Sequence, residues 1–364
     1  MGPACSMRQN MSIWMKGAAL GLWMAGTGAC TTNQGPRVIL FVADGAGVGH
    51  WTLLLHAKPD LAIRQFEISG LMDTRGGDHV VTGSAAGATA LATGERTFFG
   101  AISVAMDSTP RETVLERAMS NGLATGVMTT TNVWDATPAA FSAHAASRSE
   151  IGSITAQMAR KGMQVMMGGG RRAFEPGRRA DSTDLVSELR QRYTYIDNAE
   201  AFYALSLDTV QTLAALFTPG DMGRVAGRSP ALSDMVEAAI AILDRDPDGF
   251  FLLVENEETD SRAHANDSTA VLVADMIAFD EAVAAALRYR ERHPQTLIVV
   301  TGDHETGGIS LPPDSLRNSL LHYSTGGHTA AMIPIFAIGP GAERFGAIIE
   351  NREVGRLLLE AVSR

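Results

Sequence analysis

Short aliphatic runs alternate with alanine-rich stretches along most of the chain. The aliphatic runs predict strands at 37–43, 124–130, 163–167, 249–255, 296–301 and 332–338. The alanine-rich stretches predict helices at 84–93, 138–148, 231–243 and 269–292. Because strands alternate with helices, we expect an α/β fold whose central, mostly parallel sheet is covered by helices on both faces.

The pattern also bears on the core and on domain organisation. In the last predicted helix, an apolar stripe at helical spacing predicts that Val273, Ile277, Val283 and Leu287 are core residues. No repeat, low-complexity tract or long linker interrupts residues 37–364. We therefore predict a single domain at 31–364, preceded by a separate leader at 1–30.

The leader has the features of a signal peptide. Lys16 precedes an apolar stretch at 17–26 that is too short to span a bilayer comfortably. Small residues at 27–29 lead to Cys30, which is typical of a lipoprotein signal and predicts a lipid anchor on Cys30. The alternative is an ordinary cleaved signal peptide with an incidental cysteine. Either way we expect export to the periplasm, in the first case as a membrane-anchored lipoprotein.

Composition narrows the function. Net charge is −10, and the leader carries two cations (Arg8 and Lys16) and no anion, so without it the charge would be −12. This net negative charge argues against nucleic-acid binding as the main function. An anionic substrate would have to be attracted by local positive charge, from metals or an arginine. Cys5 and Cys30 are the only cysteines, so residues 31–364 contain no internal disulfide.

Carboxylates, imidazoles and one serine cluster at the predicted strand ends, where an open α/β sheet places its active-site crevice. The candidate metal ligands are Asp44, Asp135, Thr137, Glu255, Asp260, His264, Asp303, His304 and His328, and the candidate nucleophile is Ser84. Ligands of this kind without cysteine suit zinc and magnesium. Taken singly, Asp44, Ser84 and Asp135 could equally be helix N-caps. Asp260 and His264 are four residues apart, which could place both on one helical face.

Six segments in order resemble the alkaline phosphatase family. They are VILFVADGAGVG (38–49), VTGSAAGATALATG (81–94), DATPAAFSAHAASR (135–148), VENEETDSRAHAND (254–267), VVTGDHETGG (299–308) and TGGHTA (325–330). The resemblance implies a three-layer α/β/α sandwich. It also implies hydrolysis of small-molecule phosphate monoesters through a phosphoserine intermediate, at a site with two zinc ions and one magnesium, in a homodimer.

The resemblance further implies a role for each candidate. Ser84 would be the nucleophile, and Arg148 would grip the phosphate oxygens. Asp260, His264 and His328 would bind the first zinc, Asp303 and His304 the second, and Asp135, Thr137 and Glu255 the magnesium. Asp44 would bridge the second zinc and the magnesium.

Two positions depart from the family pattern. Gly83 stands where some members have an aspartate that orients the arginine, and Ser261 replaces a lysine, histidine or tryptophan near the phosphate. We therefore expect a less firmly held Arg148. A phosphodiesterase or nucleotide pyrophosphatase of the same superfamily is the alternative, but such enzymes usually lack this arginine and the third metal site. A binding protein without activity is the other alternative, and the full ligand set argues against it.

Overall fold

The computed structural model describes residues 35–313 and 321–363, and it contains a ten-stranded sheet. From one edge to the other the strands are β14 (Ala347–Glu350), β2 (Ile68–Asp73), β13 (Ile333–Ile338), β8 (Thr296–Thr301), β1 (Arg37–Ala43), β7 (Phe250–Asn256), β3 (Ala124–Asn132), β4 (Val165–Gly169), β6 (Leu213–Leu216) and β5 (Thr194–Ile196). Among these ten strands β13 alone runs antiparallel to its neighbours. The prediction of a mostly parallel sheet is confirmed.

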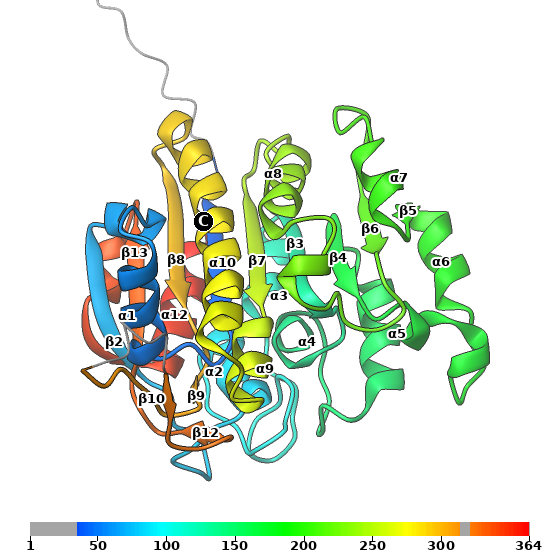
Figure 1. Cartoon of the computed structure of the whole chain (residues 1–364). Coiled ribbons are helices and arrows are strands. Elements are labelled where there is room, and N and C mark those ends of the chain that lie inside the picture. Colours follow the sequence, from blue (N-terminus) through cyan, green and yellow to red (C-terminus); the bar gives the residue numbers. More distant parts are fainter. Residues whose placement is uncertain (1–34, 314–320, 364) are drawn as a thin grey trace, which may run out of the picture. The chain divides into compact units, whose positions relative to one another are not determined.

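Helices cover both faces of the sheet, which gives three layers (Figure 1). One face packs against α2 (Ser84–Thr93), α3 (Val114–Ser120), α4 (Ala136–Ser142), α5 (Ile151–Lys161), α6 (Leu185–Arg192) and α12 (Asn351–Ala361). The other face packs against α1 (Val48–Ala57), α7 (Ala199–Tyr203), α8 (Leu232–Leu243) and α10 (Thr269–Arg292). Short 3₁₀ helices lie at Ala62–Gln65, Arg171–Phe174, Pro176–Arg178, Val225–Gly227 and Ala342–Phe345.

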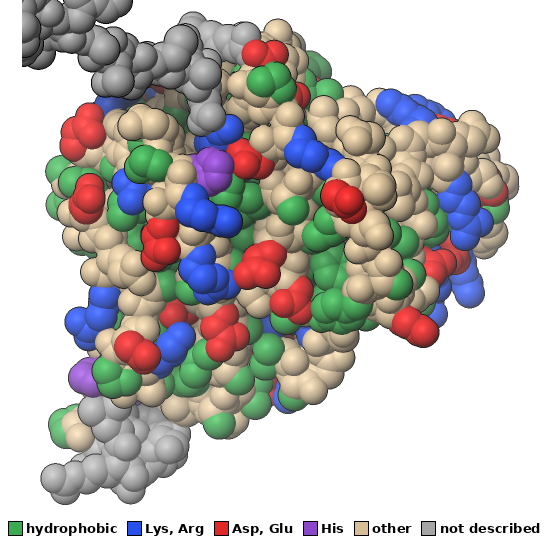
Figure 2. Space-filling view, turned by 90° about the horizontal axis from the view of Figure 1, so that it is seen from above, with side chains coloured by type: hydrophobic (Ala, Val, Ile, Leu, Met, Phe, Trp, Pro, Cys, Tyr) green, Lys and Arg blue, Asp and Glu red, His purple; other side chains and the backbone are tan. Residues whose placement is uncertain are grey.

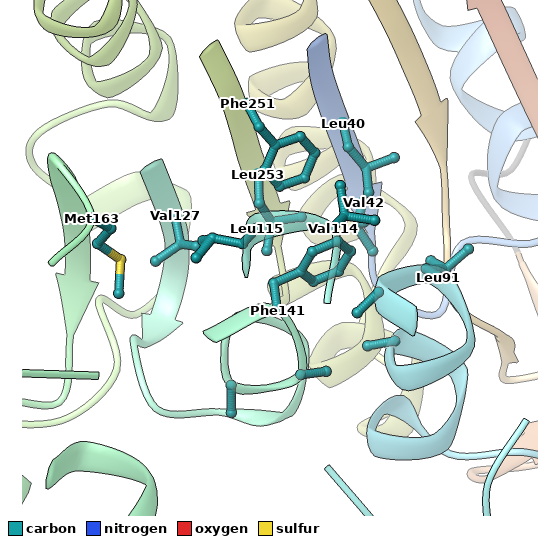
Figure 3. Packing of buried hydrophobic residues seen from close by; sticks show 14 of the residues in the cluster. Leu40, Val42, Leu91, Val114, Leu115, Val127, Phe141, Met163, Phe251 and Leu253 are labelled. Atoms are coloured by element: carbon teal, nitrogen blue, oxygen red, sulfur yellow. The ribbon is translucent and has the colours of Figure 1, made fainter. Parts of the chain in front are cut away.

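β1 shows why both faces are apolar. Successive side chains of a strand point to opposite faces, so Leu40 and Val42 enter one core cluster while Ile39 and Phe41 enter the other. In the first cluster Phe141 of α4 stacks on Phe251 of β7, with ring centroids 5.8 Å apart (Figure 3). Burial of apolar surface on both sides explains the near-continuous hydrophobic runs of the central strands.

The sequence placed the central elements well. The bounds of β1, β8, α2 and α10 are as predicted, and the other predicted strands differ by a few residues at most. The predicted bounds of one helix are wrong: the helix expected at 138–148 begins at Ala136 and ends at Ser142. Ala143 is extended, and Ala145 then forms a β-bridge with Ile102. Arg148 therefore lies in a loop.

Most of the predicted site residues lie beyond the C-terminal ends of the parallel strands, which are at the bottom in Figure 1. α9 (Glu258–His264) lies there, as do two short pairs of strands: β9 (Glu305–Thr306) with β12 (His328–Thr329), and β10 (Ile309–Ser310) with β11 (His322–Tyr323). The surface at the opposite ends of the parallel strands, seen in Figure 2, carries interspersed acidic and basic side chains.

Contacts divide the chain between Asn33 and Gln34, and every described residue belongs to the second part. The predicted leader at 1–30, with Cys30, lies outside the described residues. None of the helices described is both long and apolar enough to cross a membrane.

Candidate metal centre and nucleophile

Asp44, Asp303 and His304 come together because β1 and β8 are neighbours and both stop at this end of the sheet. One ligand atom from each lies within 4.8 Å of the others. His304 Nε2 is 3.3 Å from Asp44 Oδ1 and 3.4 Å from Asp303 Oδ2. Those two carboxylate oxygens are buried and have no hydrogen-bond partner among the described residues. Buried oxygens left in this way suit a cation.

Asp260, His264 and His328 form a second group beside the first. Asp260 and His264 lie one turn apart on α9, as their spacing predicted, and His264 Nε2 is 3.2 Å from Asp260 Oδ2. His328, from β12, places its Nε2 3.0 Å from His264 Nε2 and 3.7 Å from Asp260 Oδ1. The rings of His304 and His328 stack with centroids 3.7 Å apart, so the two groups adjoin.

The second nitrogen of each histidine is held by an oxygen. His264 Nδ1 lies 2.7 Å from the Gly326 carbonyl oxygen, and His328 Nδ1 lies 2.9 Å from that of Thr82. These carbonyls accept, so both Nδ1 atoms carry the proton. Thr306 donates its hydroxyl proton to Asp260, and its oxygen lies 3.2 Å from His304 Nδ1. In the neutral form of each imidazole this leaves Nε2 with a lone pair that faces carboxylates, the arrangement that metal-binding histidines need, and a bound cation would displace a proton from His264.

Electrostatics also favours bound cations. Burial, and next the charge of Asp303, raises the pKa of Asp44 well above its usual value. Burial raises the pKa of Glu255 to about 8, although the hydrogen bond from Thr129 acts against it. The hydrogen bond to Asp260 raises the pKa of His264 to about 9. Negative charges crowded in a buried site cost free energy unless positive charge balances them, and divalent cations would do so.

The three remaining ligand candidates lie at the ends of β3 and β7 and the start of α4. Asp135 caps α4 by accepting a hydrogen bond from the Ala136 amide. Thr129 Oγ1 donates to Glu255 Oε2 over 2.5 Å, and the charge of Asp135 contributes to the raised Glu255 pKa. Thr137 is fully buried. Oxygen ligands of this kind are those that magnesium prefers.

Ser84 is the first residue of α2, and its side chain faces the metal-ligand candidates. Gly83 precedes the helix in an extended conformation, and Ser84 Oγ lies 3.1 Å from His304 Nε2. Ser84 is buried, with 6% of its surface exposed. The amides and dipole of a helix N-terminus favour negative oxygen atoms, so an anionic phosphate would be stabilised beside this hydroxyl.

Arg148 reaches the site from the loop after α4. Its amide donates to the Gly100 carbonyl oxygen over 2.8 Å, and its Nη2 donates to Asp135 Oδ1. Burial lowers the Arg148 pKa, but the charges of Asp135, Asp44 and Glu255 outweigh it and raise the pKa overall. Arg148 therefore has a carboxylate partner although Gly83 supplies none.

Sequence reasoning missed several residues that hold the ligands in place. Thr306 orients both Asp260 and His304, and Thr82 contributes a backbone carbonyl. Gly45, with φ +70°, is needed because a Cβ there would lie 2.8 Å from Asp260 Oδ1 and from Thr306 Oγ1. The only signal for Thr306 in the sequence was its position two residues after His304.

Comparisons with known proteins identify the family. A model of the alkaline phosphatase family matches residues 37–320. Alkaline phosphatase 3 of Bacillus subtilis is 28% identical over 90% of this chain and 88% of its own length. Streptomycin-6-phosphate phosphatase of Streptomyces griseus is 32% identical over 93% of this chain and 95% of its own length.

A solved structure is similar over the same extent. The alkaline phosphatase of the Antarctic bacterium TAB5 is 32% identical to this chain and superimposes on it with a TM-score of 0.83. The match covers 90% of this chain and 98% of the TAB5 chain. A histidine-to-aspartate variant of that enzyme was solved with magnesium bound in its M3 site. The chain belongs to the alkaline phosphatase family and is a phosphate monoester hydrolase.

Proposed function

We propose that the chain hydrolyses phosphate monoesters through a phosphoserine on Ser84, at a site that holds two zinc ions and one magnesium ion. Asp260, His264 and His328 would hold the first zinc, and Asp303 and His304 the second. Asp135, Thr137 and Glu255 would hold the magnesium, with Asp44 between the second zinc and the magnesium. Bound ions would lower the pKa of the Ser84 hydroxyl and offset the charge of the phosphate.

The observation that carries this proposal is the surroundings of Ser84. Its Oγ lies at the start of α2, 3.1 Å from His304 Nε2 and beside the two groups of ligand candidates. In the second group, carbonyl oxygens accept hydrogen bonds from His264 Nδ1 and His328 Nδ1. The N-cap of α2 is Gly83, so helix capping does not account for the position of the Ser84 hydroxyl beside His304.

The residues divide the reaction between them. Ser84 Oγ attacks phosphorus, the bond to the alcohol oxygen breaks, and the alcohol leaves. Water then attacks the phosphoserine, which releases phosphate and restores Ser84. Throughout, Arg148 offers its remaining donors to two phosphate oxygens, while its bond to Asp135 restricts the orientation of the guanidinium.

A paired substrate assay tests the proposal. The purified protein should hydrolyse p-nitrophenyl phosphate far faster than bis(p-nitrophenyl) phosphate, and chelation should abolish both activities. Acid quenching during turnover should trap phosphate on Ser84, identified by mass spectrometry. Faster diester hydrolysis would favour the phosphodiesterase alternative, which the presence of Arg148, Thr137 and Glu255 argues against.

The same proposal covers location and assembly. We infer export directed by residues 1–30, with Cys30 as the site of a lipid anchor, and a homodimer as the resemblance implies. The relative from Streptomyces griseus is named for a phosphorylated small molecule, so we propose a small organic phosphate as substrate here too. Sedimentation of the purified protein tests the dimer.

A further inference from the structure

Phe99 is an exposed aromatic residue next to the nucleophile. It is 58% exposed, and a Cβ built on Gly83 would lie 2.9 Å from its Cε2 and 3.1 Å from its Cζ. The ring edge therefore packs against the Gly83 backbone, one residue before Ser84. The same Cβ would lie 3.8 Å from His328 Cε1, so the side of Gly83 that Phe99 covers also adjoins a candidate metal ligand.

The conformation of Gly83 does not explain why glycine stands there. Its φ is −119° and its ψ is 168°, an extended backbone that any residue adopts. The nearest obstacle to a Cβ at this position is the Phe99 ring, because a contact of 2.9 Å is too short and a larger residue would have to displace the ring. A single exposed apolar residue needs no explanation, but one that is fitted to a glycine beside a nucleophile does.

Phe99 contacts the neighbouring segment through its backbone and its ring. The Phe99 amide faces Asp78 Oδ2 at 3.5 Å, and its ring lies 5.8 Å from that of His79. The next residue, Gly100, accepts the amide hydrogen bond of Arg148. The loop that carries Phe99 is thus the loop that holds the backbone of the arginine that we propose to bind phosphate.

The apolar character extends beyond one ring. Val80, Val81 and Met106 are also exposed, by 68%, 41% and 53%. They come from the same two segments as Phe99, which are joined by a hydrogen bond of 2.8 Å from the Gly77 amide to the Thr97 carbonyl oxygen. Apolar side chains are therefore exposed on both segments that flank Phe99, together with the polar Asp78 and His79.

We propose that Phe99, seated on Gly83, is a specificity-determining residue that selects phosphate monoesters with a flat, apolar leaving group, such as an aryl group. This rests on the proposed function, since Ser84 must be the residue that receives the phosphate. A flat leaving group would pack on the exposed part of the ring, whereas a small alkyl group would not reach it. Aromatic pairs favour offset or edge-to-face contacts and contribute beyond the area they bury.

Equilibrium binding of two phosphonates to the metal-loaded protein tests this without turnover. Phenylphosphonate should bind about five- to tenfold more tightly than methylphosphonate, on the scale of one aromatic contact. Phe99→Ala and Phe99→Leu should each remove most of that preference. Tyr203→Ala is the matched control, because Tyr203 is 57% exposed on α7 at the far end of the sheet, and it should keep the preference in full.

Gly83→Ala provides an independent arm. The added methyl group displaces the ring, so this variant should also lose phenyl preference, and adding it to Phe99→Ala should cause no further loss. A preference that survives in Phe99→Ala, or is missing in the wild type, overturns the proposal. If neither phosphonate nor inorganic phosphate binds, the proposed function itself fails, and this inference fails with it.

Discussion

Arg148 and Asp135 are joined by a hydrogen bond from Nη2 to Oδ1, so the arginine that we propose to bind phosphate is tied to the residue that caps α4. In some relatives an aspartate in the place of Gly83 would perform this task. Here the partner belongs to the proposed magnesium ligands instead. Charge-assisted bonds of this type are short and directional, and the arginine is consequently oriented from the side of the third metal group.

Adding a second carboxylate should tighten the hold on phosphate. We expect Gly83→Asp to strengthen inhibition by inorganic phosphate by about tenfold, the effect of roughly 1–2 kcal/mol from one further bond to Arg148. KM should fall, and turnover should be equal or slower because product release would be slower. Gly83→Ala is the control, since it displaces Phe99 without adding charge. Weaker phosphate inhibition in Gly83→Asp than in Gly83→Ala would contradict this role.

Removal of the nucleophile should separate chemistry from structure. Ser84→Ala should keep its fold and metal content, because no ligand is removed, yet lose turnover by about a thousandfold or more. Metal analysis and initial rates with p-nitrophenyl phosphate check both parts. Phosphate trapped on another residue of the wild-type protein would contradict the assignment.

Chelation should destabilise the protein as well as inactivate it. Without cations the buried carboxylates of Asp44, Glu255, Asp260 and Asp303 face one another, and ions that bind only the folded state stabilise it by mass action. We expect a lower melting temperature after removal of metal, restored by added zinc and magnesium. An unchanged melting curve in protein shown to be metal-free would mean that the ions do not support the fold.

His144 should make stability depend on pH. Both ring nitrogens face oxygens, with Nδ1 2.8 Å from the Ser103 carbonyl oxygen and Nε2 2.9 Å from Glu116 Oε1, so both donate. The bond to Glu116, which also pairs with Lys161, raises the His144 pKa. A raised pKa in the folded state means that the stabilisation is complete below the unfolded value, about 6.5, and is lost as pH rises through the folded value.

We therefore expect His144→Ala to lower the free energy of unfolding by about 1–2 kcal/mol near pH 6, and by less at a pH well above the His144 pKa. Urea unfolding at the two pH values measures this. Glu116→Gln should remove the same pH dependence while His144 is still present. A deficit that is equal at both pH values would show that His144 acts through packing alone.

The lipid anchor can be tested in cells. If Cys30 is lipidated, Cys30→Ser should move the protein from the membrane fraction to the soluble periplasm with little change in specific activity. Wild-type protein found soluble with an unmodified N-terminus would exclude the anchor.

Helix bounds could be predicted from the sequence where residues within the helix or next to it determine them. α2 could be read from its run of small residues and Gly94, which ends the helix in the left-handed conformation. The end of α4 could not. It depends on Ala145 pairing with Ile102 and on His144 reaching Glu116, contacts that join segments far apart in the sequence.

The apolar stripe of α10 shows the same limit. Val283 and Leu287 are buried as expected, but Val273 and Ile277 are only half-buried. The buried face instead includes Asp275 and Asp280, which polar patterning would place in solvent. Arg228 and Lys58 pair with them at 2.9 and 3.0 Å, and these partners come from distant parts of the chain.

The antiparallel direction of β13 bears on how such an enzyme could diversify. Because β13 is antiparallel to β8, the chain leaves β8 and enters β13 at the same end of the sheet, where the active site lies. The connection between these two strands, residues 302–332, therefore needs no crossover helix. This one excursion supplies Asp303, His304, Thr306 and His328. Residues could be inserted or deleted between the paired strands β9 and β12 without shifting any strand of the large sheet. Substrate range could therefore change by loop length in this segment while the architecture is inherited intact.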